Sequence, residues 1–179
     1  MPGLRLVLTK VDDDILYSFF AYPNFSSSGK KYLELTKFWK STNELKEKFG
    51  ESGLRMKNRL TRLEAFGLLK TTGIRKGSRW DSYWYISDAG IYYLMSKLKL
   101  PYLKKFLRTN DNIRELSFIK DLSYTKTGEM KINYLFNRIH NCVESKEYSR
   151  ISQIVYEWLT ETFGKPFLRF PITPVFRAQ

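Results

Sequence analysis

Basic side chains are concentrated in one stretch of this chain, residues 53–79. Eight basic residues stand there against a single acid, Glu64. They are Arg55, Lys57, Arg59, Arg62, Lys70, Arg75, Lys76 and Arg79. Guanidinium and ammonium groups gathered in this way suit a polyanion, and an α-helix has the right width for the major groove of DNA. A helix face that is merely solvated more often alternates acids with bases at i,i+4. The stretch therefore predicts contact with nucleic acid, with a solvated surface as the alternative.

Side chains in and near this stretch could bond DNA in different ways. Arginines can bond guanine, and Asn58 can bond adenine, through two atoms each, while the basic residues of 75–79 suit phosphates or the minor groove. Thr42 and Asn43 belong to a helix N-terminus that could bind phosphate, although simple capping is the favoured interpretation there. The candidate DNA-contacting residues are Thr42, Asn43, Arg55, Lys57, Asn58, Arg59, Arg62, Arg75, Lys76, Ser78 and Arg79.

Other groupings of reactive side chains predict no catalysis. His140 and Cys142 stand at i,i+2 of an expected helix, so they point to different sides and cannot complete a tetrahedral metal site. The chain has no second histidine and no Gly-rich phosphate loop. We therefore expect a protein that is not an enzyme and that holds neither cofactor nor metal. The aromatic run 83–85 could stack on unpaired bases, but core and cross-strand packing is the favoured interpretation.

The composition is that of a folded, strongly basic protein. Of its 179 residues 42% are hydrophobic and 16% aromatic, and the formal net charge is +13. This apolar content is enough for a packed core, and the charge points to nucleic acid or an anionic surface. The single cysteine, Cys142, excludes an internal disulfide. No apolar run reaches the length of a membrane span and the N-terminus lacks a signal-peptide pattern, so we expect a cytoplasmic, nucleoid-associated protein.

The elements that precede the basic stretch follow from capping residues. Three acids at 12–14 favour the N-terminus of a short helix that stops before Pro23. Residues 24–31 form a loop, and 31–39 fit either a helical stripe or a short strand. Ser41 begins a capped helix that ends at Gly50, and Ser52 caps a second helix over about 52–66.

This second helix and the segment after it carry the basic residues. Its buried row is expected at Met56, Leu60, Leu63 and Gly67, and the opposite face at Arg55, Asn58, Arg59 and Arg62. Two strands, 68–72 and 80–86, then flank a loop at 73–79 that has basic residues at its tip. Ser87 caps a further helix with inner positions Ile91, Leu94, Met95 and Leu98.

Three more helices are expected in the C-terminal part. Their apolar stripes fall in 112–122, 132–143 and 151–163, after Pro101 marks either a linker or the first turn of a helix. The tail 166–176 mixes three prolines with large apolar side chains, which suits an extended arm pressed against another surface.

Two short motifs carry a resemblance to a known family. They are the helix exit Leu60-x-x-Leu63-x-x-x-Gly67-Leu68-Leu69 and the re-entry Ile86-Ser87-x-x-Gly90. With the hairpin between them, residues 12–99 resemble a winged helix-turn-helix domain of the archaeal and bacterial transcription-regulator type. The expected fold class is mainly α with a small β-hairpin wing, followed by a helical C-terminal extension. The long gap before Ser41 and the 80-odd residues after Pro101 depart from the simplest pattern.

The resemblance implies a function and a division of the chain. Residues 1–100 would be the DNA-binding domain, and 101–179 a helical extension for dimerisation or partner binding. The helix at 52–66 would enter the major groove of double-stranded DNA, and the wing at 73–79 would lie along the backbone or minor groove. A sequence-specific transcriptional regulator acting as a homodimer is the leading interpretation. The alternatives are a winged-helix protein-interaction module, of cellular, viral or mobile-element origin, and a binder of single-stranded nucleic acid.

Overall fold

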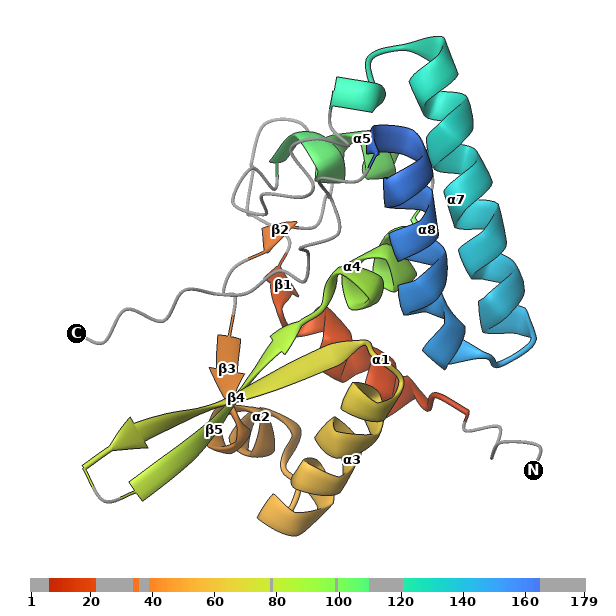
Figure 1. Ribbon diagram of the computed structural model, residues 1–179. Helices are drawn as coiled ribbons and strands as arrows, with labels where there is room; N and C mark the ends of the chain where they lie inside the picture. Colours follow the sequence, from red (N-terminus) through yellow and green to blue (C-terminus); the bar gives the residue numbers. More distant parts are fainter. Residues whose placement is uncertain are drawn as a thin grey trace.

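A computed structural model describes residues 7–21, 34–35, 39–77, 79–98, 100–109 and 121–164. Within these residues the protein is mainly helical, with seven α-helices, a small three-stranded antiparallel sheet and a pair of C-terminal helices (Figure 1). The predictions for 24–31, for 112–120 and for the tail at 166–176 lie outside the described residues.

Helix α1 (Lys10–Tyr17) begins at a capping box. The Asp12 N–H donates to Thr9 Oγ1, and the Thr9 N–H donates to Asp12 Oδ2 at 2.9 Å. This confirms that acids occupy the first turn. Ile15 and Leu16 are buried on its inner side.

Short strands, rather than a helix, connect α1 to the next helix where the structure describes this region. Strand β1 (Phe20–Ala21) pairs antiparallel with β2 (Glu34–Leu35), and β3 (Trp39–Ser41) leads into α2 (Thr42–Phe49). Of the two readings that the sequence left open for 31–39, the strand is therefore correct at 34–35 and 39. Helix α2 is capped by Ser41 and ends at Gly50, whose φ of 63° is readily adopted by glycine.

Helix α3 (Gly53–Ala65) begins at Ser52, whose hydroxyl accepts from the Arg55 N–H. Met56, Leu60 and Leu63 are fully buried, as predicted. Gly67 is a correction to the predicted row, because the helix has already ended. It forms a turn with φ 77°, through which the chain enters the sheet.

The sheet has the strand order β3-β5-β4. Strands β4 (Leu69–Lys76) and β5 (Arg79–Ile86) pair from Leu69 and Ile86 out to Lys76 and Arg79. The predicted loop at 73–79 was too long, because Gly73 and Ile74 continue the ladder opposite Ser82 and Asp81. The ladder extends to the pair Lys76 and Arg79, and Gly77 directly after Lys76 has φ 64°, a conformation that glycine readily adopts.

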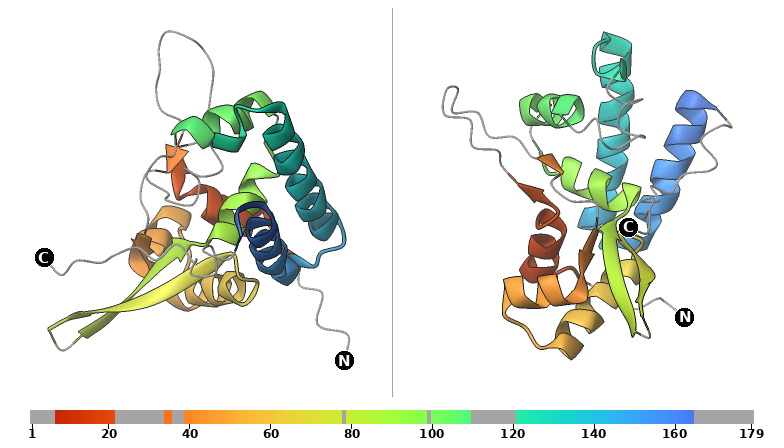
Figure 2. Two further views of the ribbon diagram at one scale, coloured as in Figure 1. Left: turned by 45° about the horizontal axis from the view of Figure 1, so that its top comes forward. Right: turned by 90° about the vertical axis from the view of Figure 1, so that its left-hand side faces the viewer.

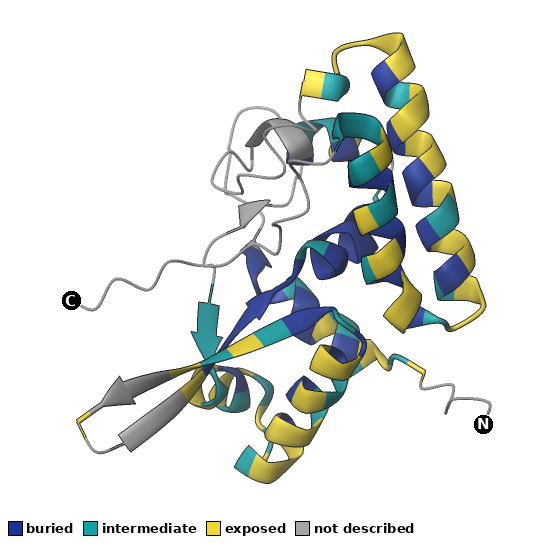
Figure 3. Ribbon diagram, viewed as in Figure 1, coloured by how far each residue is buried: buried dark blue, intermediate teal, exposed yellow. Residues whose placement is uncertain are grey.

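Helix α4 (Asp88–Met95) is the centre of the molecule. Ser87 caps it by accepting from the Gly90 N–H at 3.0 Å, and every residue from Ala89 to Met95 is buried. It packs against α1, β5, α7 (Lys126–Glu144) and α8 (Ile151–Phe163), so both ends of the described chain cover it (Figure 3).

The remaining helices complete this core. Helix α5 (Leu100–Thr109) places Pro101 in its first turn, which settles the choice that the sequence left at this residue. The stripes predicted for 132–143 and 151–163 are confirmed as the buried sides of α7 and α8, which a 3₁₀ turn η1 (Tyr148–Arg150) connects. These helices share one hydrophobic cluster with α1, α3 and α4, while the proposed boundary at residue 100 stays a prediction.

Candidate nucleic-acid interface

Helix α3 and the β4–β5 hairpin lie at the same end of the molecule, away from α5 (Figure 1). The hairpin projects beyond the helices that surround its base (Figure 2). One side of α3 is fixed in the core, so its other residues face outward in a defined direction. The exposed residues of the helix are Leu54, Arg55, Lys57, Asn58, Thr61, Glu64 and Ala65.

Arg59 is held by groups outside the helix. Its Nε donates to both carboxylate oxygens of Glu51, at 3.1 and 3.0 Å. Its Nη1 donates to Thr9 Oγ1 at 3.4 Å and lies 3.7 Å from Asp12 Oδ1. The guanidinium is thus directed toward the start of α1.

Arg62 is held by the same buried acid. Its Nη2 contacts Asp12 Oδ2, and the Asp12 side chain has no solvent exposure. Two polar atoms of this pair, Asp12 Oδ1 and Arg62 Nε, are buried without a hydrogen bond among the described residues. A buried carboxylate needs compensation by positive charge, and the two arginines of α3 provide it.

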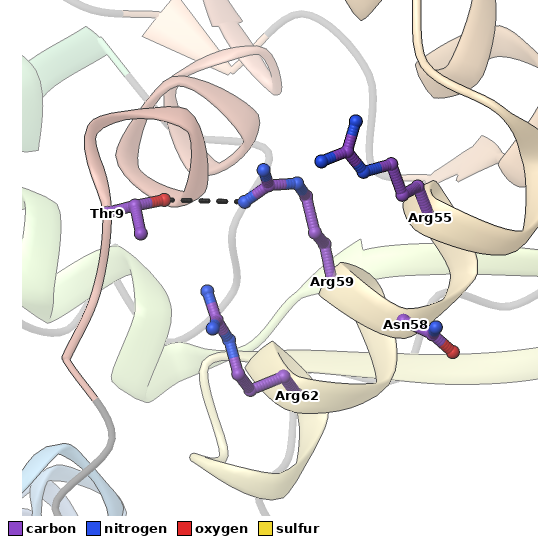
Figure 4. Close-up of a pocket in the computed structure, with 5 residues that line it drawn as sticks. All are labelled: Thr9, Arg55, Asn58, Arg59 and Arg62. Carbon is purple, nitrogen blue, oxygen red and sulfur yellow. Dashed lines mark hydrogen bonds between the residues drawn. The ribbon is translucent and has the colours of Figure 1, made fainter.

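The four polar residues that the sequence grouped on one face of α3 therefore differ in role. Arg55, Arg59 and Arg62 line, with Thr9, an open depression of about 380 Å³ between α3 and α1. Asn58 is at its edge, and its amide points away from the three guanidinium groups (Figure 4). Among the described residues, the side chains of Arg55 and Lys57 form no ion pair.

Thr42 and Asn43, although adjacent in sequence, differ in their contacts and exposure. Thr42 Oγ1 accepts from the indole Nε1 of Trp84 at 2.9 Å and is half-buried, whereas Asn43 is exposed in the first turn of α2. Ser41 caps α2 by accepting from the Glu44 N–H at 3.1 Å. The structure thus gives this N-terminus a capping role, and leaves Asn43 accessible.

The basic residues near the tip of the hairpin have only their backbone placed. Arg75, Lys76 and Arg79 lie in the last ladder pairs of β4 and β5. Their side chains, and the whole of Ser78, lie outside what the structure describes, so their contact with DNA stays a prediction.

The aromatic run 83–85 is part of the fold. Tyr83, Trp84 and Tyr85 are 6%, 3% and 6% exposed, and the Tyr83 ring meets Trp39 edge-on at a centroid distance of 5.1 Å. This confirms cross-strand packing, and no stacking platform for bases is available at these three residues.

The remaining reactive residues lie in α7. The Cys142 thiol is buried, and burial raises its pKa, while His140 is exposed and pairs with Glu144 at 3.0 Å. In the described part of the chain no three His, Cys, Asp or Glu side chains gather as metal ligands would. None of its helices combines the length and apolar character of a membrane span.

Sequence reasoning missed the residues that hold Arg59 and Arg62. Thr9 and Asp12 lie 50 positions away from the arginines they contact, and Glu51 lies in the turn before α3. The only signal was the run of three acids at 12–14, which is explained equally well by helix capping.

Comparison with protein-family models, with curated proteins and with solved structures found no match to this chain. The function is therefore inferred from the chemistry of α3 and the hairpin.

Proposed function

We propose that this protein binds double-stranded DNA, with α3 in the major groove and the β4–β5 hairpin on the adjacent backbone or minor groove, as a sequence-specific transcriptional regulator. Apart from the additional β1–β2 pair after α1, the order helix, strand, helix, helix and hairpin agrees with a winged helix-turn-helix domain. So does the pairing of β5 with both β3 and β4. These features support the family resemblance and do not depend on charge.

One observation carries the proposal. A helix fixed by three fully buried residues presents Arg55, Lys57 and Asn58 to solvent, next to a projecting hairpin whose backbone carries Arg75, Lys76 and Arg79. An exposed helix with free cations matches the width and the charge of a major groove.

The burial of residues 83–85 favours duplex over single-stranded nucleic acid, because it removes the stacking surface that unpaired bases would use. Homodimerisation through the C-terminal helices remains part of the proposal. It would place two α3 helices about one helical turn of DNA apart on a partly palindromic site.

The test is a titration of random duplex DNA at several salt concentrations. We expect micromolar or tighter binding at low salt, with affinity falling steeply as salt rises. The double variant Arg55→Ala/Lys57→Ala should weaken binding to all duplexes and reduce the salt slope by about two, since each phosphate contact contributes about 0.9.

The matched control is Lys126→Ala/Lys131→Ala, which removes two exposed cations from α7. It has the same net charge as the test variant but should keep the original salt slope. Equal losses in both variants would mean that duplex binding depends on net charge alone. No binding of either duplex or single strand would favour the protein-interaction module.

A further inference from the structure

Four exposed residues form the outermost line of α3, and the last of them, Ala65, adds only a methyl group at its C-terminal end. Leu54, Asn58 and Thr61 are spaced i, i+4 and i+7, so at 100° per residue they fall within about 60° of the helix circumference. Met56, Leu60 and Leu63 occupy the opposite side and are fully buried. A groove that receives α3 therefore meets Leu54, Asn58 and Thr61 first.

The chemistry of this line is not that of a phosphate site. Leu54 is 72% exposed, and none of the three residues carries charge. A single exposed leucine is common and by itself means little. Its place in the same row as the Asn58 amide and the Thr61 methyl group is more informative, because an amide and apolar groups together match one kind of base pair.

In the major groove an A·T pair presents the N7 acceptor and N6 donor of adenine and the C5-methyl group of thymine. An asparagine amide bonds the first two together, and leucine or the methyl of threonine packs on the third. Neither an aliphatic side chain nor a threonine methyl has a comparable partner on a G·C pair.

Arginine is the usual reader of guanine, but Arg59 and Arg62 of α3 are bonded to acids away from this outer line. Arg59 is bonded through Nε to both oxygens of Glu51, and Arg62 contacts the buried Asp12. To reach a guanine, Arg59 would have to leave the Glu51 carboxylate and Arg62 would have to leave the buried Asp12, and each move breaks an ion pair. Arg55 and Lys57 lie on the two flanks of the outer line, where the phosphate strands on either side of a groove would be.

We infer that Leu54, Asn58 and Thr61 make α3 a reader of A·T base pairs, with Arg55 and Lys57 holding the flanking phosphates. This inference rests on the proposed duplex binding, and it specifies the base pairs that the same site recognises.

The experiment uses the full chain and duplexes that share identical flanks and differ in a central block. The block is a random A·T pool, a random G·C pool, or the A·T pool with deoxyuridine in place of thymidine. Deoxyuridine removes the C5-methyl group and keeps Watson–Crick pairing. At fixed salt we expect the A·T pool to bind roughly five-fold or more tightly than the G·C pool, and deoxyuridine to remove part of that preference.

The variants identify the side chains responsible. Leu54→Ala should reduce the difference in affinity between the thymidine and deoxyuridine pools, leaving the part due to the Thr61 methyl, and Asn58→Ala should lose roughly five-fold or more on both A·T-type pools and little on G·C. Met130→Ala and Asn141→Ala are matched controls on α7, where both residues are exposed, and should keep the full preference.

The outcomes separate the inference from the proposed function. Duplex binding with equal affinity for the pools, or with a preference for G·C, overturns the inference alone. So does an A·T preference that survives both deoxyuridine and Asn58→Ala, because DNA shape would then explain it. Failure to bind any duplex at low salt overturns both.

Discussion

Asp12 serves two helices with one carboxylate. It accepts from the Thr9 N–H at the start of α1, and it compensates Arg62 and the nearby Arg59 of α3. An isolated charge that is this deeply buried is strongly disfavoured, so the acid and the arginines depend on each other.

Asp12→Ala should therefore lower the free energy of unfolding by roughly 2–4 kcal/mol, through the lost cap and the uncompensated guanidinium groups. The partial solvent exposure of both arginines keeps the expected loss below that of a fully buried pair. Urea denaturation followed by circular dichroism measures it. Asp14→Ala, at an exposed position of the same helix, is the control and should change stability by less than about 0.5 kcal/mol. Equal effects of the two substitutions would contradict the role given to Asp12.

At the level of elements, most helices were predictable from short-range chemistry, whereas α5 was left open between a linker and a helix. Ser41, Ser52 and Ser87 each stand directly before a predicted helix, and each accepts a backbone N–H three residues later. Such capping needs only neighbouring residues, which the sequence displays. The buried rows of α3, α7 and α8 were equally visible, because apolar spacing along a helix is also local.

Long-range pairing was not predictable in the same way. Gly73 and Gly77 looked alike as turn residues, and only the cross-strand ladder shows that Gly73 belongs to β4. Likewise, nothing near Arg59 or Arg62 in the sequence indicates that their partners lie on α1. The sequence therefore predicted helix α3 but not the direction in which Arg59 and Arg62 point.

Helix α4 approaches the sheet so closely that one position tolerates no side chain. A Cβ on Gly90 would lie 2.2 Å from the Leu68 carbonyl oxygen and 2.7 Å from Ile86 Cγ1. The oxygen belongs to the backbone and accepts from the Ser87 N–H, so it cannot simply rotate away.

Gly90→Ala should thus destabilise the protein by roughly 2–4 kcal/mol, despite the better helix propensity of alanine. Thermal unfolding measures the change. Gly53→Ala is the matched control in the first turn of α3. Its Cβ would meet nothing closer than Lys46 Cδ at 3.9 Å, so it should be neutral or slightly stabilising. A neutral result at Gly90 would show that α4 can move away from Leu68.

For the whole molecule, Tyr93 joins segments that are far apart in the sequence. Its hydroxyl donates to Asp13 Oδ1 at 2.6 Å, and its ring meets Tyr148 of η1 edge-on at a centroid distance of 6.1 Å. Burial, and then the bond to Asp13, raise the pKa of Tyr93 well above its usual range. Burial is also the main reason why the pKa values of Tyr85 and Tyr148 are raised.

This arrangement predicts loss of stability in alkali. Above the ordinary tyrosine pKa of 10.0 the unfolded chain releases phenol protons that the folded chain retains. Unfolding then becomes easier by up to about 1.4 kcal/mol per pH unit for each such group. The stabilisation is complete below pH 10 and falls as pH rises.

In Tyr93→Phe the free energy of unfolding should fall less steeply as the pH rises above 10. At neutral pH it should be about 1 kcal/mol lower than in the original protein, because the hydrogen bond to Asp13 is lost. Denaturation at several pH values, with tyrosinate absorbance followed in parallel, measures both effects. Tyr134→Phe, at an exposed position of α7, should leave the pH dependence unchanged. An unchanged slope for Tyr93→Phe would mean that other groups control the alkaline transition.

The contact between Gly67 and Ser152 links two parts of the molecule mechanically. Gly67 is the joint at which α3 passes into β4, and a Cβ there would lie only 2.7 Å from Ser152 Oγ of α8. Helix α8 therefore packs directly against the residue at which α3 ends and the chain turns into β4. A side chain at position 67 would have to displace the Ser152 hydroxyl and also adopt a positive φ, so the packing of α8 leaves room only for glycine where α3 passes into β4.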